Sequence, residues 1–276
     1  MRVICVVDDT VQRSSPYWGE HGLAFLIEAE GRRVLFDTGQ SGTVLLHNLR
    51  LLGIDPPTID ALAISHGHYD HTGGLPTLLE HLRPGTALYA NPDLFRERFS
   101  RREGNVQSIG PSLTKEALAA RLALELDGEP QEIVPGLWTT GEISERPEPE
   151  GKSNYHLMRE GEALVADAYL DDMALVFTVG DHLVLLCGCC HAGLLNTLAH
   201  VQQAFERPTS IIAGGLHLTS ATAQDLQHVG QVLMSMPALQ RVYPNHCTGE
   251  AAFVAMTQIL GPSIVRPCPV GTVLEF

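Results

Sequence analysis

The segment with the densest set of chemically active side chains is 65–71, whose sequence is SHGHYDH. Imidazole and carboxylate groups are ligands that zinc, iron and manganese accept in proteins. Alternate residues of an extended chain share a face, so His66, His68 and Asp70 project together. The adjacent His71 swings to the other side on a tight loop. This spacing offers His66 and His68 to one cation and Asp70 and His71 to a second, which predicts a metal site.

Other residues of the same chemical kind follow strand-like runs elsewhere in the chain. These are Ala61–Ile64 before His66, His182–Cys187 before Cys189 and His191, Ser210–Ala213 before His217, and Arg241–Tyr243 before His246. In open α/β sheets, ligands gather outside the carboxyl ends of the strands. We therefore expect these four strand ends to converge on one place.

Alternating strand and helix patterns predict an α/β fold. Two series of strands, each followed by helices, favour a four-layer αβ/βα sandwich in a single domain spanning residues 1–276. The region at about 91–161 is predicted to be an insertion or an active-site cover. The predicted strands outside the four above are Val3–Val7, Leu23–Glu28, Arg33–Phe36, Glu132–Val134, Leu137–Thr140, Met173–Val179 and Val273–Phe276. The predicted helices are Thr43–Leu52, Leu75–Leu82 capped by Thr72, Leu194–Ala204, Ala223–Met236 and Gly249–Leu260.

Composition narrows the classes of partner. The formal charge of −14 repels a nucleic-acid backbone, and no apolar run approaches a membrane span. The six cysteines show no disulfide-framework spacing, which favours a reducing cytoplasm. We expect a cytoplasmic protein with a small-molecule substrate and without a nucleic-acid or membrane partner, and a homo-oligomer is compatible with the sequence. The one basic cluster is interpreted as a solvated surface rather than a phosphate site: Arg96, Arg98, Arg101 and Arg102.

The segment from Ser65 to Gly74 resembles the signature of the metallo-β-lactamase superfamily. Asp37, which follows the strand Arg33–Phe36, matches the first acidic motif of that family. Further motifs are similar to one branch, whose members are often identified as dihydropterin–ribofuranosylaminobenzene phosphate synthase-like proteins. Those motifs are EHG at 20–22, FDTGQSG at 36–42, GCCHAG at 188–193, GGLHL at 214–218 and HCTG at 246–249.

The resemblance implies a ligand set for two divalent metal ions, zinc first, with manganese or iron as alternatives. The set is His66, His68, Asp70, His71, His191 and His246. Asp37 would support a ligand, although a simple turn cap explains it equally well. Many members have Gly-Asp where this chain has Gly188-Cys189, and that Asp usually bridges the metals. Either Cys189 takes the role as a thiolate, or His191 supplies the ligand, which we favour.

Together, these motifs and this ligand set predict a metal-dependent hydrolase. It would use a metal-activated water on a phosphodiester or other ester-type small molecule. The predicted catalytic residues are Asp70 and His217, with His217 as proton donor or phosphate contact, or else structural. His21 is a weaker candidate. The alternatives are a pterin-linked transferase that displaces pyrophosphate, an iron-dependent redox enzyme on the same ligands, and a metal-dependent binding module. Four histidines are expected to be ordinary surface or core residues: His156, His182, His200 and His228.

Overall fold

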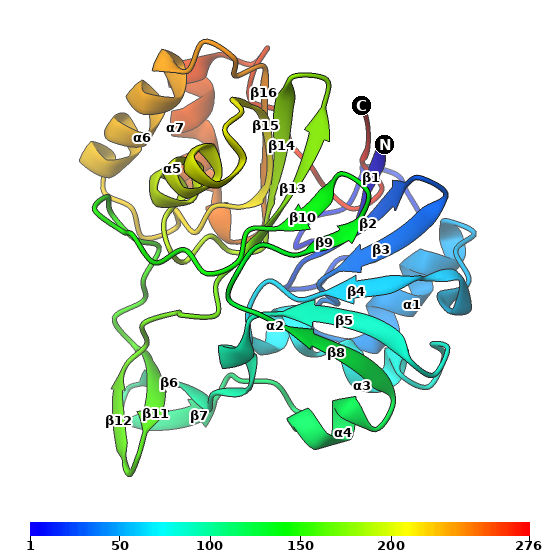
Figure 1. Ribbon diagram of the computed structural model, residues 1–276. Helices are drawn as coiled ribbons and strands as arrows, with labels where there is room; N and C mark the ends of the chain where they lie inside the picture. The colour runs from blue at the N-terminus through cyan, green and yellow to red at the C-terminus, as the bar shows by residue number, and fades with distance from the viewer. The chain divides into compact units, whose positions relative to one another are not determined.

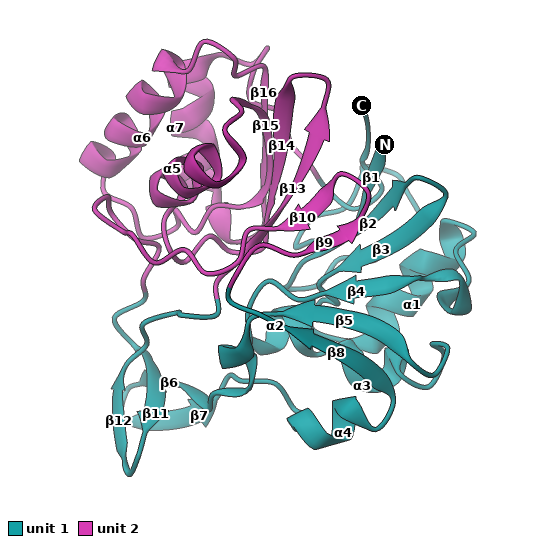
Figure 2. Ribbon diagram, viewed as in Figure 1, with its two compact units in different colours: residues 1–128, 153–171, 269–276 teal, residues 129–152, 172–268 magenta.

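The computed structural model describes residues 1–276, which divide into two compact units (Figure 2). Unit 1 comprises residues 1–128, 153–171 and 269–276, and unit 2 comprises residues 129–152 and 172–268. Each unit has a sheet of its own and helices of its own (Figure 1).

Unit 1 is built on a seven-stranded sheet in the order β17-β1-β2-β3-β4-β5-β8. Its strands are β1 Arg2–Val7, β2 Ala24–Ala29, β3 Arg32–Phe36, β4 Ala61–Ala63, β5 Thr86–Ala90, β8 Leu122–Leu126 and the edge strand β17 Val273–Glu275. Its helices are α1 Gly42–Leu51, α2 Tyr69–Thr72, α3 Leu75–Leu78 and α4 Lys115–Ala119, with 3-10 turns at Pro56–Thr58 and Pro92–Phe95.

The core of unit 1 joins one face of this sheet to α1 and α3. Leu45 and Leu49 of α1 are fully buried and belong to one apolar cluster with Leu35 of β3 and Leu62 of β4. Burial of a leucine side chain contributes on the order of 2 kcal/mol. β3 and β4 run parallel, with Phe36 paired to Ala63, so both strands end at the same edge of the sheet.

A second, four-stranded sheet of unit 1 was not predicted, because its strands are short and mostly polar. Its order is β12-β11-β6-β7. The strands are β6 Arg98–Arg102, β7 Asn105–Ser108, β11 His156–Glu160 and β12 Ala163–Ala166. The region at 91–161 also supplies β8 to the large sheet, and its role as an active-site cover stays a prediction.

Unit 2 is built on a six-stranded sheet in the order β16-β15-β14-β13-β10-β9, with three helices against one face (Figure 1). Its strands are β9 Glu132–Val134, β10 Leu137–Thr139, β13 Ala174–Val179, β14 His182–Cys187, β15 Thr209–Gly215 and β16 Arg241–Asn245. Its helices are α5 Leu194–Phe205, α6 Ala223–Ser235 and α7 Glu250–Leu260, with a 3-10 turn at His246–Thr248. Each unit therefore has one large sheet with helices packed against it.

All but one of the predicted strands and helices are confirmed, with bounds that differ from the prediction by at most two residues. The helix predicted from Leu75 to Leu82, with Thr72 as its cap, is wrong in its length and its cap. Thr72 lies inside α2, and the residue that caps α3 is Gly74, without a side-chain hydrogen bond. The chain turns twice here because His68 and Gly74 begin two separate short helices.

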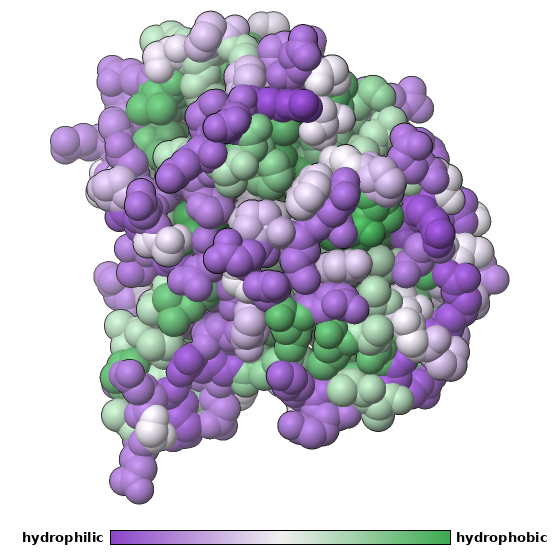
Figure 3. All heavy atoms as spheres, in the orientation of Figure 1, coloured by the Kyte–Doolittle hydropathy of each residue, from purple (hydrophilic) through white to green (hydrophobic).

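The face drawn in Figure 3 is mainly hydrophilic, with scattered apolar side chains. No helix of the structure combines the length and the apolar character that crossing a membrane requires. The interpretation of the arginine cluster as a solvated surface is wrong for Arg98, which is fully buried among carboxylates.

Candidate metal centre

The histidines of the SHGHYDH segment form a buried cluster in unit 1. His66, His68 and His71 are all at most 4% exposed. His66 Nε2 lies 3.1 Å from His68 Nδ1, and the ring centroids of His66 and His71 are 4.2 Å apart. Two nitrogens that bind one tetrahedral zinc ion at its usual bond length lie roughly 3.3 Å apart. The pair His66 and His68 therefore has the spacing of two ligands to one cation.

Asp37 orients two of these imidazoles from the neighbouring strand end. Its Oδ2 accepts from His71 Nδ1 at 2.7 Å and from the Ser65 hydroxyl at 2.7 Å, and its Oδ1 accepts the Ser65 N–H. The Ser65 hydroxyl oxygen in turn lies 2.9 Å from His66 Nδ1 and, because its own proton is donated to Asp37, accepts a hydrogen bond from His66. Asp37 thus orients His71 directly and His66 through Ser65, and it does so from a left-handed backbone conformation with φ of 61°.

These contacts decide which ring nitrogens are available to a metal. A proton on Nδ1 leaves Nε2 of His66 and His71 with its lone pair. His68 instead presents Nδ1, the atom that faces His66. Burial lowers the pKa of His68 well below its usual value, although nearby Asp70 acts in the opposite direction. Burial therefore favours the neutral form of His68, which is the form that binds metal.

Asp70 lies between two histidines of unit 1. Its Oδ2 is 3.6 Å from His71 Nε2 and 3.4 Å from His21 Nε2. His21 Nδ1 contacts Asp9 at 2.9 Å, so His21 links two carboxylates. The structure brings His66, His68, Asp70 and His71 together as predicted, and it places His21 beside them.

Unit 2 gathers its candidates at adjacent strand ends. β14, β15 and β16 are parallel neighbours, with Cys187 paired to Gly214 and Gly214 paired to Pro244. Because these strands end in register, the residues that follow them emerge along one edge of the sheet. The residues in question are Cys189, His191, His217 and His246.

Cys189 is central among the donors of unit 2. Its Sγ lies within 4.8 Å of a ring nitrogen of His191, and also within 4.8 Å of a ring nitrogen of His246. The ring centroids of His191 and His217 are 4.3 Å apart. Both alternatives for the missing Asp, Cys189 and His191, therefore remain within the cluster. Cys187 and Cys190 belong to the apolar core of unit 2, as predicted.

His217 and His246 have unusual backbone conformations. Each has a φ of 45°, which is uncommon for residues other than glycine and is found at functional sites more than elsewhere. Cys247, next to His246, was not predicted. Burial raises the pKa of its thiol, but a hydrogen bond with Cys189 and the charges of His246 and His217 lower it to about 5.

A loop before β11 holds His191 in place. The Gly151 carbonyl accepts from His191 Nδ1 at 2.8 Å, and the Gly151 N–H donates to the His191 carbonyl at 3.0 Å. This reciprocal pair fixes the ring and leaves Nε2 as the donor atom. The loop is itself tied down, since the Asn196 side chain bonds both the N–H and the carbonyl of Glu148. Nothing in the sequence around Gly151 indicated this role.

Gly151→Ala is expected to weaken metal binding about 10-fold or more, as outer contacts to metal ligands commonly do. A Cβ at position 151 would lie 2.8 Å from the His217 Cβ and 2.9 Å from the Cys190 carbonyl. The loop would then move and release His191. Competition with a chromophoric chelator measures the effect. Gly110→Ala is the matched control, because its Cβ meets nothing closer than 3.4 Å. Equal affinities in both variants would contradict the assigned role of Gly151.

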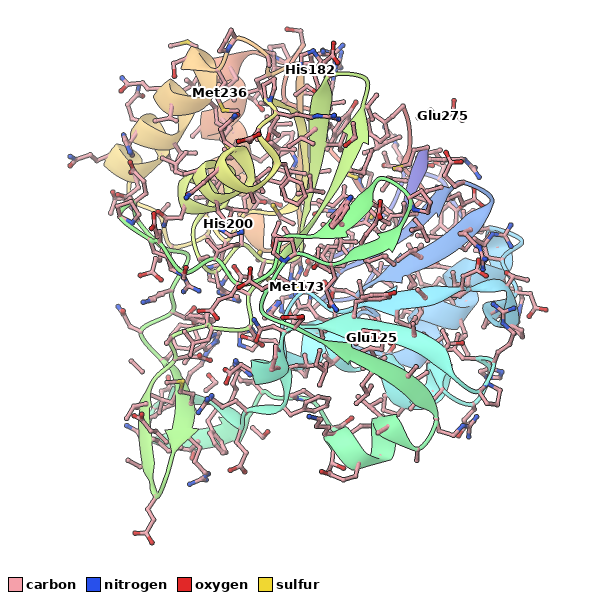
Figure 4. All side chains as sticks on the ribbon, viewed as in Figure 1. Glu125, Met173, His182, His200, Met236 and Glu275 are labelled. Carbon is pink, nitrogen blue, oxygen red and sulfur yellow. The ribbon has the colours of Figure 1, made fainter.

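Of the histidines expected to be ordinary, His156 adjoins the cluster of unit 1. Its ring centroid is 5.0 Å from that of His68, and its Nδ1 lies 3.0 Å from the Tyr169 hydroxyl. His182 begins β14, at the opposite end of that strand from Cys187, and His200 on α5 bonds a backbone carbonyl (Figure 4).

The donor set fits a divalent transition metal. The imidazoles and the carboxylate of unit 1, and the imidazoles and the thiol of unit 2, are ligand types that zinc accepts. Buried imidazoles whose ring nitrogens face each other have no obvious structural use, since apolar side chains would pack at less cost.

Known proteins resemble this chain over most of its length. The sequence model of the metallo-beta-lactamase superfamily matches residues 17–187. A 7,8-dihydropterin-6-methyl-4-(beta-D-ribofuranosyl)-aminobenzene-5'-phosphate synthase of Methanocaldococcus jannaschii is 30% identical over 91% of this chain and 89% of its own.

Solved structures share the fold of this chain. Tm1679, described as a metal-dependent hydrolase of the beta-lactamase superfamily, is 27% identical, with a TM-score of 0.84 over 100% of this chain and 99% of its own. Zinc-bound PqqB from Methylobacterium extorquens has a TM-score of 0.59 at 12% identity, over 100% of both chains, which shows the fold alone. The predicted αβ/βα fold class is confirmed, and the chain belongs to the metallo-β-lactamase superfamily.

Proposed function

We propose that this protein is a metal-dependent hydrolase of small-molecule phosphate esters. The observation that carries the proposal is the pair of donor nitrogens on His66 and His68, 3.1 Å apart and buried. The similarity to Tm1679, a metal-dependent hydrolase, supports the same reaction class. The formal charge of −14 favours a small substrate over a polyanion such as nucleic acid.

The proposed ligands fall into two sets. One consists of His66, His68 and His191, and the other of Asp70, His71 and His246. The second set has a carboxylate, which suits zinc as well as manganese or iron. Cys189 is proposed as a further donor, because its Sγ lies within 4.8 Å of ring nitrogens on both His191 and His246.

The chain's own groups have separate tasks in the reaction. When bound, divalent cations lower the pKa of water toward neutrality and polarise a phosphoryl oxygen. Asp37 keeps a proton on His71 Nδ1, which fixes the direction of the Nε2 lone pair. The Gly151 carbonyl does the same for His191. His217 is the proposed proton donor to the oxygen of the leaving group.

A second candidate is a transferase that displaces pyrophosphate from a pterin. The observation that favours it is the 30% identity, over nearly the whole chain, to the Methanocaldococcus jannaschii synthase. Both reactions place a phosphate group against the same ligands. In hydrolysis, water attacks the phosphorus atom, whereas in the transferase the aromatic amine attacks the pterin methylene carbon and pyrophosphate leaves.

Metal analysis and a substrate panel test the proposal. Protein purified without chelator and reconstituted with zinc, manganese or iron should bind at least about one equivalent of metal. With metal it should hydrolyse chromogenic phosphodiesters faster than carboxylic esters or thioesters, and chelation should abolish turnover. Less than half an equivalent of bound metal would contradict the site assignment.

A pterin substrate added to the same panel distinguishes the transferase from the hydrolase. A pterin diphosphate is offered with and without an aminobenzene ribofuranosyl phosphate. Pyrophosphate release that requires the aromatic amine, together with inert phosphodiesters, would establish the transferase and refute the hydrolase.

A further inference from the structure

Arg98 is a fully buried cation in unit 1, at the first residue of β6. Its guanidinium contacts three carboxylates, Asp93 at 3.0 Å, Asp167 at 3.1 Å and Asp171 at 2.6 Å. A buried cation requires such partners, because removal from water is otherwise prohibitive. Three carboxylates around one guanidinium exceed what neutralisation needs, so at least one of them has a further reason to be there.

Asp171 makes a contact that the other two carboxylates do not make. While its Oδ1 accepts from Arg98 at 2.6 Å, its Oδ2 accepts the backbone N–H of Gly67 at 2.6 Å. Asp93 bonds Arg96 and Arg98, and Asp167 bonds the N–H of Tyr169. Only Asp171 thus joins the buried ion-pair cluster to the residue between the two metal-type histidines.

The space around the Gly67 Cα atom is also filled by groups other than Asp171. A Cβ at position 67 would lie 2.4 Å from the Leu94 carbonyl and 3.1 Å from Nη1 of Arg98. Glycine is required here by close approach and not by its backbone conformation, since its φ is not positive. Gly67 is therefore packed against the Leu94 carbonyl and against the ion-paired side chains of Arg98 and Asp171.

We propose that Asp171 is a positioning residue for the metal centre and acts through the Gly67 N–H. By fixing Gly67, it sets the 3.1 Å distance between the donor nitrogens of His66 and His68. This inference rests on the metal centre proposed above. A carboxylate suits the task because it accepts on both oxygens, one from the amide and one from the guanidinium.

Asp171→Asn and Asp93→Asn form a matched pair of variants. Each turns one carboxylate partner of Arg98 into an amide, but only the first also disturbs Gly67. An amide has one accepting oxygen, so its NH₂ group at position 171 would face either the Gly67 N–H or Arg98. Both variants are expected to lose thermal stability, because both weaken a buried ion-pair cluster.

Metal affinity and the cobalt spectrum distinguish positioning from stability. Asp171→Asn is expected to bind zinc about 10- to 100-fold more weakly and to change the visible absorption of bound Co²⁺. Asp93→Asn should keep both properties near those of the wild type. Wild-type affinity and spectrum in Asp171→Asn, or equal changes in both variants, would overturn the inference. A wild-type protein that binds no metal would instead refute the proposed function.

Hydrogen exchange of the wild-type protein provides a second test if Asp171→Asn does not fold. The Gly67 amide should exchange as slowly as the amides of β4, because its acceptor is buried. Fast exchange at Gly67 beside protected β4 amides would show that Asp171 does not hold it, and would equally overturn the inference.

Discussion

Replacement of His66 with alanine is expected to lower kcat/KM about 1,000-fold or more and to weaken metal binding at one site. The His66 Nε2 atom faces His68 Nδ1 at 3.1 Å, so the variant removes one of the two nitrogens that unit 1 offers to this cation. Loss of a bound metal removes both the activated water and the polarised phosphoryl oxygen, which are together worth several kcal/mol. Elemental analysis and kinetics on the phosphodiester identified by the panel measure the two effects.

His81→Ala is the control for this variant, since it removes an exposed imidazole of the same unit. It should keep wild-type metal content and turnover. A His66→Ala protein that retains full activity with full metal content would show that the reaction does not use the histidine pair. Added zinc that restores activity to His66→Ala would indicate weakened binding rather than an altered reaction.

The part of the site that the sequence predicted is the part that is local in the chain. His66, His68, Asp70 and His71 lie within six positions after a short apolar strand, so one turn of chain brings them together. Asp37 was ambiguous because its role depends on β3 lying beside β4, and only the pairing of Phe36 with Ala63 shows that. The strand ends of unit 2 were predictable because parallel strands share an edge.

The rest depends on contacts between distant segments of polar sequence. Arg98 lies in a run of arginines that reads as a solvated surface, and its partner Asp171 is 73 positions away. Gly151 is 40 positions from the histidine that it orients, in a loop without periodicity. The helix predicted after Thr72 was wrong for a related reason. Gly73 and Gly74, which approach backbone carbonyls at Gln40 and Thr38, separate α2 from α3, and tertiary context there overrides local propensity.

Replacement of His217 with alanine is expected to leave the metal content unchanged and to lower turnover at least about 10-fold, within the roughly 100- to 10,000-fold range of general acid catalysis. His217 follows β15, and its ring centroid is 4.3 Å from that of His191. It is not needed for either proposed set of three ligands. A histidine beside the ligands but outside the sets is a candidate proton donor, because imidazole gains and loses a proton near neutral pH.

Esters that differ in the pKa of the leaving group distinguish a proton donor from a residue that only packs near the site. An aryl leaving group of low pKa departs without protonation, so His217→Ala should lose little rate on nitrophenyl esters. On an alkyl ester of high leaving-group pKa the loss should be largest, and the acidic limb of the pH profile should shift or disappear. His182→Ala is the control, since His182 begins β14 at the end of the strand opposite Cys187. Loss of metal from His217→Ala would make this residue a ligand, and an equal loss of rate on both esters would refute proton donation.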